Sequence, residues 1–211
     1  MKKVVDTQNT LAQHLIVGTS SIALALAFKY LMDLSWSVSF ARVSFILLFL
    51  TLLVSPLMRI KKPSKASNPL KSPWFWRGEL GIWFVVTGVI HFFFAMSGHI
   101  AWDLSVAFGP GGYGLANLMG VVALAWGIML ACTSCRKAIC SIGIKSWKWL
   151  HSFTYVVFYL ISFHVVYFQF LSEYRLKNLG MPDWFGYAAI AMVILLVVLQ
   201  FIAFIKAVVE K

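Results

Sequence analysis

The sequence predicts an all-α membrane protein, a bundle of six transmembrane helices whose N- and C-termini both lie in the cytoplasm. Hydrophobic residues make up 61% of the 211-residue chain and its mean hydropathy is +0.84. Soluble domains are usually about 45–50% apolar. Six apolar stretches each approach the roughly 20 residues that a helix needs to cross a bilayer. Lys and Arg, in addition, gather in alternate connections between these stretches.

The six expected spans are joined by short connections, so neighbouring helices should run antiparallel within one domain that covers residues 1–211. No stretch is left for a second folded domain. The G-x-G-x-x-G string at residues 109–114 lies in a connection without a strand–helix context and is expected to be a turn, and no P-loop occurs, so the chain should lack a nucleotide-binding domain of its own. The expected spans are residues 11–30, 40–58, 80–100, 113–133, 149–170 and 185–206.

Loop charge predicts the orientation of the bundle. The formal net charge is +11, and the third connection carries only Asp103. Since positively charged loops stay in the cytoplasm, this pattern indicates topology and contact with lipid headgroups, not nucleic acid. The first connection has one residue of each sign, Asp33 and Arg42. The basic residues of the second and fourth connections are Arg59, Lys61, Lys62, Lys65, Lys71, Arg77, Arg136, Lys137, Lys145 and Lys148.

Two histidines lie at matching depth in spans that run in the same direction. If Arg77 and Lys148 mark the inner ends of the third and fifth spans, a rise of 1.5 Å per residue places His91 about 21 Å and His164 about 24 Å into the membrane. An imidazole in hydrocarbon is costly unless something binds it. The pair is therefore expected to hold one ligand between two helices.

A flat cofactor held by two imidazoles in an apolar bundle is most simply a b-type heme, because imidazole suits iron. Two axial histidines occupy both open positions of the iron, which favours electron transfer. Zinc is disfavoured, since no Cys or carboxylate lies at the depth of His91 and His164. The alternative is that each histidine merely forms hydrogen bonds within the bundle.

A third histidine, His151, is expected only about 5 Å from the inner surface. It could share an inner heme with His14, which lies near the start of the first span. It could instead contact a flavin or a heme propionate, with Arg77 and Lys148 binding the phosphate or propionate groups. His99, about 33 Å from the inner edge, is expected at the outer surface.

The three cysteines form no recognised site. Cys132 and Cys135 make a C-x-x-C without a βαβ context, and Cys140 adds no cluster spacing. We expect reduced thiols at the end of a helix, with no disulfide framework.

Three stretches resemble the ferric-reductase-like transmembrane domain superfamily. They are Ser55-Pro56-Leu57 at the end of the second span, RGELGIWFVVTGVIHFF around His91, and KSWKWLHSFTYVVFYLISFHVVYF around His151 and His164. The resemblance runs from the second span to the fifth. Within the superfamily the chain is most similar to the heme-binding membrane subunit of the bacterial methionine sulfoxide reductase system.

This resemblance implies a multi-pass protein of the bacterial inner membrane with one or two b-type hemes. Members with two hemes carry two histidines about 14 residues apart on the third span, but here Arg77 takes the place of the second. That departure argues against a conventional inner heme and is shared with the methionine sulfoxide reductase subunit. The resemblance to that subunit implies flavin mononucleotide as a candidate inner cofactor. The resemblance also implies a cytosolic flavin reductase as electron donor and a periplasmic molybdenum-containing reductase as acceptor.

Other functions remain compatible with the residues. A quinone-linked cytochrome b would be reduced by quinol, and a ferric reductase would pass its electrons to ferric iron. A non-heme transporter or assembly factor would use its histidines structurally or to carry protons. If the chain instead functions as the resemblance implies, it is an electron-transfer subunit of an oxidoreductase system, with no catalytic residues of its own.

Overall fold

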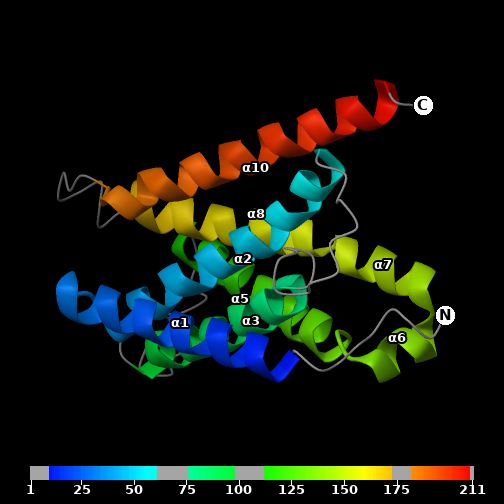
Figure 1. The fold of residues 1–211 in the computed structure, drawn as a ribbon. Helices are drawn as coiled ribbons and strands as arrows, with labels where there is room; N and C mark the ends of the chain where they lie inside the picture. The colour runs from blue at the N-terminus through cyan, green and yellow to red at the C-terminus, as the bar shows by residue number, and fades with distance from the viewer. Residues whose placement is uncertain (1–9, 61–75, 98–111, 173–181, 210–211) are drawn as a thin grey trace.

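The computed structural model describes residues 10–60, 76–97, 112–172 and 182–209, and all its regular structure there is helical (Figure 1). The helices, in chain order, are α1 (Thr10–Leu31), α2 (Trp36–Ile60), α3 (Arg77–Ala95), α5 (Gly112–Cys132), α6 (Arg136–Ile142), α7 (Ile144–Ser152), α8 (Thr154–Val166), the π-helix η5 (Tyr167–Leu171) and α10 (Trp184–Val209).

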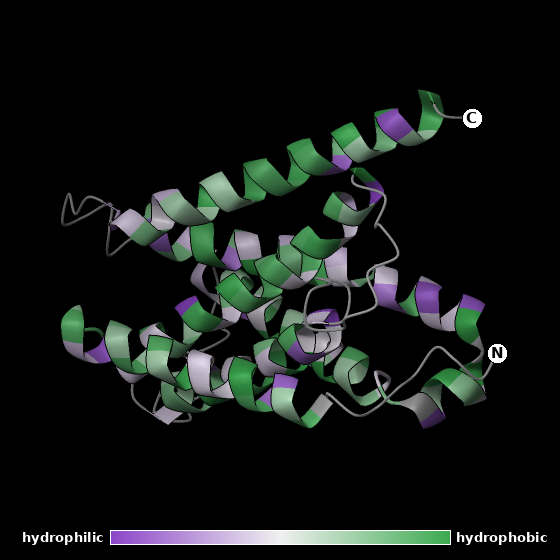
Figure 2. Ribbon diagram, viewed as in Figure 1, coloured by the Kyte–Doolittle hydropathy of each residue, from purple (hydrophilic) through white to green (hydrophobic). Residues whose placement is uncertain are grey.

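Six helical stretches are long and apolar enough to cross a membrane, so the predicted six-span helical fold is confirmed. They coincide with the expected spans to within a few residues, and apolar residues dominate them in Figure 2. Many of their large apolar side chains are exposed on the outside of the bundle, as lipid-facing residues must be.

The fifth span is not one continuous helix, as residues 149–170 were expected to be. It is divided into α7, α8 and η5, with a break at Phe153. The Thr154 hydroxyl donates to the carbonyl of His151 at 2.7 Å and satisfies one acceptor at the break. A Thr that bonds back to the preceding turn often bends a helix. As a result, His151 and His164 lie on different helices.

Helix α2 is the centre of the bundle: α1, α3 and α10 all pack against it (Figure 1). Helix α5 packs against both α3 and α8, the helices that carry His91 and His164. In the core, the rings of Phe45 from α2 and Phe158 from α8 stack with centroids 5.8 Å apart.

Two polar contacts tie α10 to α2 at opposite ends. Arg42 was expected in a connection but lies inside α2, 3% exposed, in a salt bridge with Asp183 just before α10. Its guanidinium also lies over the rings of Trp184 and Phe185. A buried charge is tolerated in a membrane span when it is paired, which explains its position. At the other end, Lys206 Nζ donates to the carbonyl of Ile60 at 2.6 Å.

Candidate functional site

The structure brings His91 of α3 and His164 of α8 together. Their ring centroids are 6.4 Å apart and their planes cross at 74°. Neither side chain comes from a neighbouring stretch of sequence, so the pair depends on how α3 and α8 pack around α5. The depth matching predicted this meeting from the sequence.

Each imidazole is held by a backbone carbonyl. His91 Nδ1 lies 2.9 Å from the carbonyl oxygen of Ser37 and 3.0 Å from the Ser37 hydroxyl. His164 Nδ1 lies 2.8 Å from the carbonyl oxygen of Ala116. A carbonyl can only accept, so each Nδ1 carries the proton and the lone pair of each neutral ring is on Nε2. Metal-binding histidines almost always show this second hydrogen bond, which fixes the tautomer and the ring orientation.

The ring separation fits a single metal ion between the two imidazoles. A metal–imidazole bond of about 2 Å puts each ring centroid about 3 Å from the metal. Two imidazoles that held one metal ion would then have centroids about 6 Å apart, and the centroids of His91 and His164 are 6.4 Å apart. Among the described residues no group of three His, Cys, Asp or Glu side chains could hold a metal. The donor set therefore matches a bis-imidazole heme better than a zinc site.

The rings sit in tight surroundings. A Cβ on Gly120 of α5 would lie only 2.9 Å from His164 Nδ1, so only glycine lets the imidazole take this position. The cavity beside the rings has a volume of about 110 Å³. This is less than the roughly 300–1,000 Å³ of a typical ligand pocket. A porphyrin would therefore have to displace lining side chains such as Phe92 and Leu124, and the fit rests on the ligand pair.

A second and larger cavity of about 490 Å³ lies toward the end of the bundle where α3 begins. Three cationic side chains line it: Arg59 of α2, Arg77 of α3 and Lys148 of α7. No Asp or Glu is among its described lining residues. The remaining polar groups in its wall are those of Thr51, Ser55, Ser134, Trp147, His151, Ser152, Thr154 and Tyr155.

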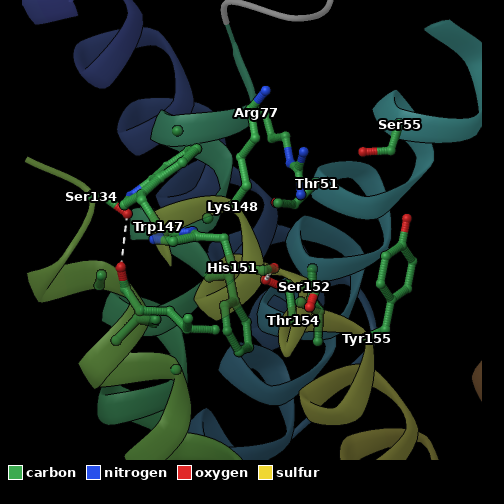
Figure 3. Close-up of a pocket in the computed structure, with 18 of the residues that line it drawn as sticks. Thr51, Ser55, Arg77, Ser134, Trp147, Lys148, His151, Ser152, Thr154 and Tyr155 are labelled. Atoms are coloured by element: carbon green, nitrogen blue, oxygen red, sulfur yellow. Dashed lines mark hydrogen bonds between the residues drawn. The ribbon is translucent and has the colours of Figure 1, made fainter. Parts of the chain in front are cut away.

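His151 lies in this cationic pocket, as Figure 3 shows, together with Arg77 and Lys148. Its Nε2 is 3.3 Å from the Thr133 hydroxyl, and its ring lies 4.2 Å from that of Trp147. The Trp147 indole N–H donates to the carbonyl of Thr133 at 3.0 Å. The imidazole is thus fixed against the end of α5 instead of facing a second histidine.

The two cavities share one wall. Phe84, a buried residue of α3, lines both of them, and Val85 and Gly127 extend the larger cavity toward the first. The pair of histidines and the cationic pocket are therefore neighbours along the same helices. The larger cavity, which contains His151, therefore lies beside the paired histidines, as expected for an inner cofactor next to an outer one.

Not every predicted site residue joins these two sites. His14 is on α1, which packs against α2 and α3, and it is absent from the described lining of the cavity that contains His151. No described contact joins the two histidines, and His151 instead lines the cationic pocket together with Arg77. His99 and most of the basic connection from Arg59 to Arg77 lie outside the described residues.

Three features of the sites were missed from the sequence. The carbonyls of Ser37 and Ala116 carry no sequence signal, because any residue has one. Gly120 could have been found as a glycine in an apolar span at the depth of His164. Arg59 was noted only as loop charge, although it lines the pocket.

Comparison with known families gives one match. The sequence model of the family described as "Ferric reductase like transmembrane component" matches residues 40–162, more than half of the chain. The matched region includes His91 and His151 and ends just before His164. No curated protein matches the chain.

Proposed function

Because the chain belongs to the ferric reductase-like transmembrane component family, we propose that it is a b-type heme subunit that carries electrons from the cytoplasmic side of a membrane to an acceptor outside. Family membership implies transmembrane electron transfer, typically with heme.

The observation that carries the proposal is the pair His91 and His164. Two neutral imidazoles from different helices, 6.4 Å apart and each fixed through Nδ1 by a backbone carbonyl, have the donor chemistry of a bis-histidine heme. Such a heme, when bound, supplies reversible one-electron chemistry. The protein's part is to keep the two rings fixed and to exclude water and other ligands from the metal.

For the inner level we propose flavin mononucleotide instead of a second heme. Arg59, Arg77 and Lys148, which line the cationic pocket, would bind the phosphate through charge-assisted hydrogen bonds, which are strong. His151 and Trp147 offer an aromatic wall for the flavin ring system. Arg77 stands where a second heme ligand would be expected, which argues against a second bis-histidine site.

The partners follow from the orientation that the loop charges predict. With the cationic pocket at the cytoplasmic face, a cytosolic flavin reductase would deliver electrons to it. The acceptor would be a periplasmic molybdenum-containing methionine sulfoxide reductase, and the membrane would be the bacterial inner membrane. The resemblance around His91, His151 and His164 supports this assignment within the family.

The proposal is tested by quantifying heme and flavin per chain in the purified protein and then adding donors. We expect one heme and one flavin per chain, and rapid heme reduction by reduced flavin. Rapid reduction by a quinol but not by reduced flavin would instead support a quinone-linked cytochrome b. Colourless protein from heme-replete cells would overturn the proposal and support a transporter or assembly factor.

A further inference from the structure

Helices α6 and α7 form a hairpin that stands apart from the rest of the bundle (Figure 1). The turn between them is Gly143, whose φ of +79° is a conformation that favours glycine. None of the α7 side chains is buried. Helix α6 packs mainly against α7, so this hairpin has a surface that the described protein leaves uncovered.

The uncovered surface is partly apolar. Ile142, Ile144 and Trp149 are 39%, 61% and 67% exposed. Large apolar side chains with such exposed fractions are unfavourable in water. They suit the boundary between lipid headgroups and acyl chains, where Trp is enriched. Helix α6 joins the span Gly112–Cys132 to the span Ile144–Leu171, and α7 is the first part of the second of these spans. The hairpin therefore lies where the two spans meet a membrane surface.

The same surface is cationic without any acidic counterpart. Lys137 and Lys145 are exposed, and Arg136 and Lys148 belong to the same segment. In the sequence, no Asp or Glu occurs anywhere between Asp103 and Glu173. An acidic residue is the usual partner of an exposed lysine, so the complementary charge must come from outside this part of the chain.

The arrangement of residues on α7 separates two faces. Trp147 and His151, four residues apart, point into the cationic pocket, with their rings 4.2 Å from each other. Lys145 and Trp149, also four residues apart, lie on another face of the helix and line no described cavity. One face of α7 therefore serves the pocket and the other is available to a partner.

We propose that the α6–α7 hairpin binds anionic phospholipid headgroups at the cytoplasmic surface of the membrane. The charge complementarity selects anionic lipid, and the neighbouring Ile144 and Trp149 select the lipid interface over an acidic soluble protein. Lipid binding on the outer face of α7 would hold the helix that carries His151. The inference itself does not depend on which cofactor the pocket binds.

The native cysteines offer a test, because all three in the chain lie in or just before this hairpin. Cys140 is exposed on α6, and replacing Cys132 and Cys135 by serine leaves it as the single reporter. This reporter protein is placed in nanodiscs of phosphatidylcholine alone, or of phosphatidylcholine mixed with phosphatidylglycerol. The rate at which a membrane-impermeant maleimide labels Cys140 is then compared.

We expect phosphatidylglycerol to slow labelling about tenfold, and high salt or Lys137→Gln/Lys145→Gln to restore most of the rate within the same anionic nanodiscs. Lys29→Gln is the matched control, because it removes a cation from the last turn of α1, outside the hairpin. In this variant phosphatidylglycerol should slow the labelling of Cys140 as much as in the unaltered reporter protein. Neither lysine of the double variant lines the cationic pocket, so an unchanged absorption spectrum would show that the variant is folded. Equal labelling in both lipids, or equal slowing in the double variant, would overturn the proposal.

Discussion

The paired-histidine site and the cationic pocket share helices α3, α5 and α8 and the wall residue Phe84, yet they are built differently. The first has two imidazoles, each fixed by a carbonyl, and a cavity of about 110 Å³. The second has one imidazole, three cations and about 490 Å³. Under the proposed function, the first site would select a metal by two fixed imidazoles and the second would select an organic anion by charge and volume.

The largest difference between the two sites is expected when one of the two proposed heme ligands, His91 or His164, is removed. We expect His91→Ala and His164→Ala each to lower the heme content per chain by much more than tenfold. Even the loss of a residue that only hydrogen-bonds to a metal ligand lowers metal affinity by about 10–100-fold. The measurement is heme extraction and quantification against protein concentration.

His151→Ala and His14→Ala are the matched controls for these variants. Both should keep the bis-histidine spectrum, because neither side chain reaches the paired-histidine site in the described structure. Heme loss in His151→Ala equal to that in His91→Ala would mean that the two sites bind the same kind of cofactor.

Removing positive charge from the cationic pocket should have the opposite effect, with weaker flavin binding and unchanged heme content. Arg77→Gln/Lys148→Gln should weaken flavin mononucleotide binding by at least about a hundredfold, because each of the two lost hydrogen bonds to a charged group contributes about 1.5–3 kcal/mol. The heme content should stay the same. Flavin titration followed by fluorescence gives the affinity, and Lys145→Gln, on another face of α7, should match the unaltered protein. Undiminished flavin affinity would contradict the role of this cluster.

A smaller effect is expected from crowding the second imidazole. Gly120→Ala places a Cβ within 2.9 Å of His164 Nδ1, so the ring must move away from the carbonyl of Ala116. We expect about tenfold weaker heme binding. Gly78→Ala is the control, since a Cβ there meets nothing within 4 Å. Equal heme affinity in both variants would show that the orientation of His164 is unimportant.

The smallest effect concerns the hydroxyl that supports His91. Ser37→Ala removes one of the two oxygens near Nδ1 but leaves the backbone carbonyl. Heme content should change by less than about threefold. The midpoint potential should rise, because a less basic imidazole stabilises the oxidised metal less. Ser39→Ala, which removes a hydroxyl that donates to the carbonyl of Ser35 just before α2, should leave a redox titration unchanged. A lowered potential in Ser37→Ala would contradict the proposed proton on Nδ1.

Much of the fold and one of the two sites were predictable from the sequence. Span length and hydropathy predicted six helices because a bilayer imposes a minimum apolar length. Counting residues from Arg77 and Lys148 also brought His91 and His164 to one level, since helical rise is constant. Depth arguments succeed where two helices run roughly parallel and straight.

The same arguments did not predict how the fifth span is divided or how the helices are arranged laterally. The break at Phe153 moved His151 onto a separate helix, and no periodicity indicated it. His14 and His151 were compared by depth alone, although α1 packs on α2 and α3. Arg42 was taken for loop charge because its partner Asp183 is 141 residues away in the sequence. Lateral position around the bundle depends on packing, which depth does not describe.

The most direct test of the central claim is the electron paramagnetic resonance spectrum of the oxidised, purified protein, with heme counted per chain. If His91 and His164 bind one iron and the cationic pocket binds none, the spectrum should contain a single low-spin species with two imidazole ligands at one heme per chain. A high-spin signal, a species with only one histidine ligand, or two bis-imidazole species at two hemes per chain would contradict it.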